Sequence, residues 1–136
     1  MKEVSLMLQV DKSKIILMVQ SANIVFCYFH ISPIILKEFQ DKYGEDAMIN
    51  SKPALKIYCI NNNIVTELET IFMHPLANNW YIHLDKAPMN LYVKIGRVLP
   101  DNSFVTFCIS NIVTTPRKSQ SEDKRVYYID IFDDNK

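Results

Sequence analysis

The chain has 136 residues, of which 49% are apolar and 22% charged, and its fifteen basic and fifteen acidic side chains cancel. This length and balance suit one globular domain that can bury a core without metals or disulfides. The zero net charge argues against a protein that binds nucleic acid or an anionic membrane, because both partners need a clustered positive surface.

Short apolar runs, several of them alternating with polar residues, indicate a β-rich chain. The expected strands lie at 4–10, 15–19, 24–31, 55–60, 64–73, 80–84, 91–97 and 104–110. The run 15–19 is apolar at every position, which predicts a central strand buried on both faces. The run 64–73 has a polar middle, which predicts either two short strands or one strand with a bulge.

One helix is predicted between the third and fourth of these strands. Ser32 is a favourable N-cap, and Pro33 suits the first helical position, where no backbone donor is needed. Apolar residues then recur at helical spacing up to Tyr43, and Gly44 is placed to end the helix. We expect this helix to pack on a sheet.

The three cysteines, Cys27, Cys59 and Cys108, lie far apart in apolar runs. Their spacing matches neither a zinc site nor a redox pair, so we interpret them as small buried side chains in a reducing compartment. The first apolar stretch ends at Val10, too short for a signal-peptide core, and no run approaches the roughly 20 apolar residues of a membrane span. We predict a cytoplasmic location, with no metal and no cofactor.

About seven strands with one inserted helix at about 33–43 predict a mainly β protein, an immunoglobulin-like antiparallel β-sandwich. The spacing of Pro88 four residues ahead of Tyr92 resembles the tyrosine corner, a motif of such domains. We expect one domain over 1–117 with a short N-terminal strand, a polar linker at 118–125, and an apolar, acidic tail at 126–136. The tail could form an edge strand of its own domain or pair with another molecule.

Two motifs carry a resemblance to a known family: Asn79-Trp80-Tyr81, and Ser110-Asn111-x-Val113-x-Thr115-Pro116-Arg117. Over roughly residues 14–117 the chain resembles the bacterial domain of unknown function 4912 family. The resemblance implies little function, because its members are uncharacterised. Some lie in longer chains beside domains named after glucan branching or a nucleic-acid-binding terminator module, and fold does not fix function.

The chain departs from the family pattern in two places. Tyr28-Phe29 stands where the family has Tyr-Trp, which keeps an aromatic ring but loses the indole donor. Gln20-Ser21-Ala22 stands where the family has Arg-Asp-Pro. If that Arg-Asp pair binds a ligand in other members of the family, we expect this chain to lack that activity.

A candidate binding surface follows if the strands at 80–84 and 91–97 pair as a hairpin, because their outward side chains would then be cross-strand neighbours. The candidate ligand-binding residues are Tyr81, His83, Tyr92 and Lys94, joined by Tyr28 and His30 if their strand is adjacent. Aromatic faces with polar tips suit a sugar ring or a base. The alternative is an ordinary amphipathic outer face, or a face that the helix covers.

The motif residues are expected to be structural: Trp80, Asn111, Thr115, Pro116 and Arg117. Trp80 shares a strand face with apolar neighbours, which predicts a core position. Asn111 is expected to bond local backbone and Arg117 to pair with a carboxylate at the end of the last strand.

Catalytic patterns are lacking. The three histidines lie in or beside different strands, and two glycines are too few for a nucleophile elbow or a phosphate-binding loop. We predict a non-catalytic binding or interaction module, with carbohydrate, such as a glucan, as the first candidate partner. The alternative is a protein–protein interaction module that acts through an edge strand or the C-terminal tail. Nucleic acid is the weakest candidate.

Overall fold

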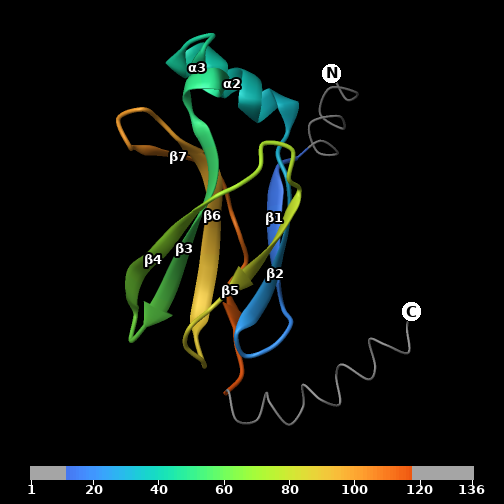
Figure 1. The fold of residues 1–136 in the computed structure, drawn as a ribbon, viewed down its shortest axis with the longest axis vertical. Coiled ribbons are helices and arrows are strands. Elements are labelled where there is room, and N and C mark those ends of the chain that lie inside the picture. The colour runs from blue at the N-terminus through green and yellow to red at the C-terminus, as the bar shows by residue number, and fades with distance from the viewer. Residues whose placement is uncertain (1–11, 118–136) are drawn as a thin grey trace, which may run out of the picture.

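The computed structural model describes residues 12–117. Within this range, eight strands form two antiparallel sheets that face each other as a sandwich, with two short helices across one end (Figure 1). The mainly β prediction is confirmed, whereas the immunoglobulin-like topology stays a prediction. The predicted N-terminal strand, the linker at 118–125 and the tail at 126–136 lie outside the described residues.

The two sheets differ in width. Sheet A has the strand order β1-β2-β5, and sheet B has the order β4-β3-β6-β7, with β8 also beside β6. The strands are β1 Lys14–Val19, β2 Ile24–His30, β3 Lys52–Asn61, β4 Ile64–Phe72, β5 Asn79–His83, β6 Asn90–Val98, β7 Phe104–Ile109 and β8 Val113–Thr114. β4 is one strand, and the bulge expected in this run lies where its pairing with β3 shifts register, between Ile57 and Tyr58.

The predicted helix is present as α2, Pro33–Tyr43. The Ser32 hydroxyl accepts a hydrogen bond from the Ile34 amide at 3.1 Å, as expected of an N-cap. Gly44 ends the helix at a φ of +108°, and its amide donates to the Gln40 carbonyl at 2.8 Å. These local signals define the helix independently of its surroundings.

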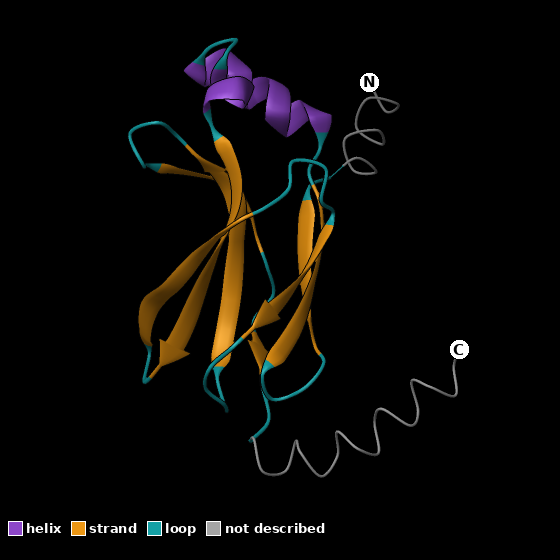
Figure 2. Ribbon diagram, viewed as in Figure 1, coloured by secondary structure: helices purple, strands orange, loops and turns teal. Residues whose placement is uncertain are grey.

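The position of the helix differs from the expectation of packing on a sheet face. α2 and a second, four-residue helix, α3 (Ala47–Asn50), lie across one end of the sandwich (Figure 2). The ring of Phe39 on α2 meets the ring of Phe107 on β7 edge to face, with the centroids 5.4 Å apart. α2 therefore closes the end of the core, and neither it nor α3 covers an outer sheet face (Figure 2).

The prediction that 15–19 forms a central, doubly buried strand is wrong. β1 lies at the edge of sheet A, with Ile15 and Leu17 in the core but Ile16 41% and Met18 46% exposed. The alternation was hidden in the sequence because the outward positions of this strand are also apolar.

The predicted hairpin between 80–84 and 91–97 is also wrong. β5 pairs with β2 in sheet A, whereas β6 pairs with β3, β7 and β8 in sheet B. The segment 84–89 crosses from one sheet to the other instead of turning within one. Adjacent strands with a short connection are usually paired, but a sandwich requires some connections to change sheets.

The core fills the space between the sheets. Its buried residues are Ile15, Leu17, Val25, Cys27, Phe29, Leu55, Ile57, Met73, Ile82, Leu84, Leu91, Val93 and Ile95. Every strand from β1 to β6 except β4 contributes to this set; β4 packs against it only through the partly buried Ile71.

One side chain joins the two sheets along one side. Asn111, between β7 and β8, accepts a hydrogen bond from the Leu17 amide of β1 at 2.8 Å and donates to the Leu17 carbonyl at 3.2 Å. Its side-chain amide thus occupies the place of a neighbouring strand's peptide group. The expectation of a local backbone partner is wrong, since Leu17 lies 94 residues away along the chain.

Replacing Asn111 by alanine should lower the free energy of unfolding by about 2 kcal/mol, because two hydrogen bonds to an edge strand are lost. Urea denaturation gives this value. The neighbouring Ile112→Ala is the control, since Ile112 is 61% exposed and should change stability by less than about 0.5 kcal/mol. Equal effects of the two substitutions would contradict the bridging role of Asn111.

Cys27 makes stability depend on alkaline pH. It is 0% exposed, and burial raises the pKa of its thiol from 9.0 to about 12. The unfolded thiol therefore ionises first, so this contribution is complete below pH 9 and declines as pH rises toward 12. Between pH 8 and pH 10 the chain should lose about 1 kcal/mol more stability than Cys27→Ala in reducing buffer. Parallel slopes for the two proteins would contradict this.

Candidate functional site

The six candidate ligand-binding residues lie on two opposite faces of the sandwich. Alternation along β2 and β5 places Tyr28, His30, Tyr81 and His83 on the outer face of sheet A. Tyr92 and Lys94 lie on the outer face of sheet B. The predicted single group is therefore wrong, because the hairpin that would have joined its halves does not exist. Tyr28 and His30 do share a face with Tyr81, as expected if their strand were adjacent.

The outer face of sheet A carries a cluster of rings with polar neighbours, which we call the aromatic face: Phe26, Tyr28, Asn79, Tyr81 and His83. Tyr81 is 55% and Tyr28 40% exposed. Phe26 is the cross-strand partner of Tyr81, with ring centroids 4.9 Å apart and planes at 52°. Asn79 is opposite Tyr28, which brings an amide beside an exposed ring.

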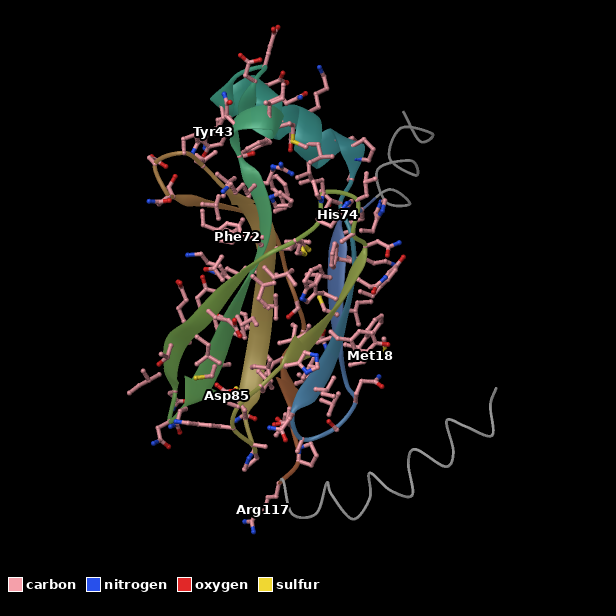
Figure 3. The ribbon with its side chains drawn as sticks, in the orientation of Figure 1. Met18, Tyr43, Phe72, His74, Asp85 and Arg117 are labelled. Carbon is pink, nitrogen blue, oxygen red and sulfur yellow. The ribbon has the colours of Figure 1, made fainter. Side chains whose placement is uncertain are left out.

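The edges of the aromatic face are apolar on one side and polar on the other. Ile16 and Met18 of β1 are the register partners of Tyr28 and Phe26, and both are exposed. Figure 3 shows Met18 and Phe72 on opposite flanks of the sandwich. His83 lies at the far end of β5, opposite Ile24. Sheet A thus presents a continuous outer surface in which rings, aliphatic side chains and hydrogen-bonding groups are adjacent.

The outer face of sheet B has a different character. Tyr58 and Tyr92 stack on each other with centroids 5.2 Å apart and planes at 12°, and the Lys94 ammonium lies 5.0 Å from the Tyr58 ring. Burial raises the pKa of the Tyr58 hydroxyl, outweighing the opposite effect of nearby Lys94. Lys56 forms an ion pair with Glu67 at 3.3 Å. These groups already contact one another, so fewer ring faces are open to a ligand.

Two other lysine side chains lie over aromatic rings on sheet B. Lys56 lies 5.3 Å from the ring centroid of Phe104, and Lys52 lies 5.7 Å from that of Phe72. Contacts of this kind stabilise an outer face by cation–π attraction and by shielding apolar surface. They explain why an aromatic-rich face can exist here without a ligand.

The motif residues that are expected to be structural lie in different surroundings. Trp80 faces the core and is partly buried against it. Thr115 is 1% exposed; its amide donates to the Met89 carbonyl at 2.9 Å, and its hydroxyl accepts from the Met89 amide at 2.8 Å. Pro116 and Arg117 are exposed. The expected carboxylate partner of Arg117 is not found among the described residues.

Hollows open at several places on the surface of the described range. One of about 500 Å³ lies between the turn after α2 and the β6–β7 turn at 99–101. A second, of about 250 Å³, lies between α2 and the strand ends and includes His74 and Arg97 in its wall. A third, of about 470 Å³, lies between β4 and the end of β5 and includes Glu69 and His83. Of the aromatic face, only His83 forms part of the wall of one of these hollows, the third.

Arg97 is a structural residue that sequence reasoning missed. It is 8% exposed, donates from Nε to the Ser51 hydroxyl at 2.7 Å, and donates from Nη2 to the Met48 and Ser51 carbonyls at 3.1 Å each. Burial lowers the pKa of its guanidinium. The signal was available, since Arg97 continues the inward alternation of Leu91, Val93 and Ile95. It ties β6 to α3.

Arg97→Met should lower the free energy of unfolding by about 3 kcal/mol, because buried carbonyls and a hydroxyl lose their donor. Denaturant unfolding measures it. Arg117→Met is the matched control: Arg117 is exposed, and its loss should cost less than about 0.5 kcal/mol. If both variants unfold at the same denaturant concentration, Arg97 does not hold α3 in place.

The family model described as "Domain of unknown function (DUF4912)" matches residues 11–126. The chain belongs to this family. The match covers both motifs and every described strand of the DUF4912 domain. Among curated proteins no match is found. Within residues 12–117 no cluster of His, Cys, Asp and Glu could hold a metal ion, and no helix is long and apolar enough to cross a membrane.

Proposed function

We propose that this chain is a non-catalytic binding module that takes a carbohydrate on the aromatic face of sheet A. The observation that supports it best is the pair of exposed rings Tyr28 and Tyr81, with Asn79 opposite Tyr28 on the neighbouring strand and on the same face as Tyr81. A sugar presents C–H groups on its ring face and hydroxyls at its edge. Exposed tyrosines match the former and the Asn79 amide matches the latter.

The restricted position of the Tyr81 ring strengthens this proposal. Its ring is held against Phe26, so less side-chain freedom is lost when a ligand stacks on it. By contrast, Tyr58 and Tyr92 on sheet B already stack on each other. Sheet A is therefore the better platform, which moves the proposed site away from Tyr92 and Lys94. No carboxylate lies on β1, β2 or β5, which suits a neutral glycan such as a glucan.

A second candidate function is protein–protein interaction through the outer edge of β4. In the described residues β4 pairs only with β3, and its first six residues are exposed on both faces. Ile64 is 65%, Val65 51% and Leu68 41% exposed. An unpaired strand with apolar side chains can add a strand from a partner. Glu67 and Glu69 make this edge acidic as well as apolar.

We also propose a bacterial cytoplasm as the setting. The three free thiols Cys27, Cys59 and Cys108 support a reducing compartment. The family resemblance supports the bacterial origin. Neither bears on the choice between the glycan and the protein partner.

A glycan array with the full chain tests the first proposal. The intact chain should bind at least one neutral glucan, and Tyr28→Ala/Tyr81→Ala should bind it about tenfold or more weakly, since two stacking rings are lost. Isothermal titration with the best oligosaccharide then gives both affinities.

The matched control is Tyr58→Ala/Tyr92→Ala, which removes two tyrosines from the opposite sheet. It should keep glycan affinity within about twofold. Equal loss in both double variants would point to general destabilisation and contradict the assignment to sheet A. If the intact chain binds no glycan and a pull-down partner is released by Val65→Lys/Leu68→Lys, the β4-edge function replaces the first proposal.

A further inference from the structure

The second hollow has a buried positive charge in its wall that no negative charge balances. Arg97 is 8% exposed and lines this hollow. Its three hydrogen bonds go to uncharged groups, the Ser51 hydroxyl and the carbonyls of Met48 and Ser51. No carboxylate of the described residues lies within ion-pair distance of the guanidinium. Because a buried charge is costly unless it is paired, this guanidinium can still gain from an anion.

The Nη1 group of Arg97 is the part of the side chain that is left to bind one. Within residues 12–117 it has no hydrogen-bond partner, since the bonds of Arg97 come from Nε and Nη2. No fully inaccessible side-chain nitrogen or oxygen of a buried residue in this range lacks a partner, so Nη1 must be reachable from outside. Arg97 lines the second hollow but neither the first nor the third. The hollow is thus where the N–H groups of Nη1 can meet a ligand.

His74 adds a second donor to the same wall. Its Nδ1 accepts a hydrogen bond from the Leu76 amide at 3.1 Å. A nitrogen that accepts carries no proton, so the proton of the neutral imidazole lies on Nε2, which then donates. Figure 3 shows His74 below the helices, at the end of the sandwich where this hollow opens.

The deeper part of the wall is apolar. Phe29, Met73 and Ile95 belong to the buried core and line the hollow, as do Ile31 and Ala77, which are partly buried against that core. A ligand that enters here therefore meets hydrogen-bond donors and an apolar surface together, the combination typical of small-molecule sites.

The absence of acidic side chains distinguishes this hollow from the other two. Among the described residues that form its wall, none is Asp or Glu. The first hollow has Glu45, Asp46 and Asp101 in its wall, and the third has Glu69 and Asp85. Of these hollows, the second is therefore the one whose charge suits an anion.

The volume of the second hollow, about 250 Å³, limits the size of the ligand. A cavity of about 150 Å³ holds one benzene molecule. A single aromatic ring or a short alkyl chain with one acidic group would therefore fit. A carboxylate is the acidic group that matches a guanidinium best, because its two oxygens accept hydrogen bonds from the N–H groups in one plane.

We propose that the second hollow is a binding site for a small organic carboxylate. The carboxylate accepts hydrogen bonds from Arg97 Nη1 and His74 Nε2, and the apolar body of the ligand packs on Phe29, Met73 and Ile95. The bound anion also balances the buried charge of the guanidinium. No residue of the aromatic face lines this hollow, and the proposal does not rest on carbohydrate binding.

Titration of the full chain with benzoate and hexanoate, followed by NMR, tests the proposal. At least one of them should give saturable shifts of the Ala77 amide and of the Arg97 side-chain resonances. Its affinity should be at least about tenfold higher than that of the matching neutral amide, benzamide or hexanamide, which has nearly the same shape but no charge. Constant ionic strength keeps the screening of charges equal in all titrations.

Substitutions in the wall locate the bound carboxylate. Ala77→Phe should fill the hollow and weaken binding by about tenfold or more. Leu76→Phe is the matched control, because Leu76 is 86% exposed and does not line the hollow; it should keep the affinity within about twofold. His74→Leu removes the Nε2 donor and should weaken carboxylate binding by about fivefold, with little change for the neutral amide.

Three results would overturn the proposal. The first is the lack of any saturable shift with either carboxylate up to about 10 mM. The second is equal affinity for a carboxylate and its amide, which would show an apolar hollow in which Arg97 recognises no charge. The third is unchanged carboxylate binding in both Ala77→Phe and His74→Leu, which would place the anion elsewhere. If Ala77→Phe does not fold, unchanged binding in His74→Leu alone overturns the assignment.

Discussion

The pairing of Asn111 with the backbone of Leu17 is the interaction on which the arrangement of the two sheets depends. Two sheets packed face to face are held mainly by apolar side chains, which fix their distance but not their lateral offset. A side-chain amide bonded to both the backbone N–H and the backbone C=O of one residue, Leu17, defines that offset. It also satisfies an edge that would otherwise be open.

The sandwich is asymmetric. Sheet A has three strands and sheet B has five, and the first six residues of β4 are exposed. The family motif at 110–117 makes contacts at two places: Asn111 bonds to Leu17 on the edge of β1, and Thr115 bonds to Met89, which lines the third hollow. The motif at 110–117 thus makes structural hydrogen bonds, whereas Asn79 and Tyr81 of the other family motif lie on the exposed aromatic face.

The two outer faces illustrate how composition alone can mislead. Both carry tyrosines, but on sheet B the rings contact one another and nearby lysines, while on sheet A Tyr28 and Tyr81 remain open. The zero net charge of the chain also gives no sign of where the lysines lie. Lys52, Lys56 and Lys94 are all on sheet B. The ring of Phe26 packs against Tyr81. Because Phe26 is two residues from Tyr28, the alternation along β2 was enough to predict that Phe26 and Tyr28 share a face.

The sequence by itself determined most local elements: the strands β1 to β7 but not β8, the limits of α2 through Ser32 and Gly44, and the inward and outward positions along most strands. These depend on interactions within a few residues and on a repeat of two or 3.6 positions. Only the tertiary structure decided that β5 and β6 belong to different sheets, that β1 is an edge, and that Asn111 reaches Leu17. Such pairings join residues far apart in the chain, and their energies depend on neighbours that no local pattern names.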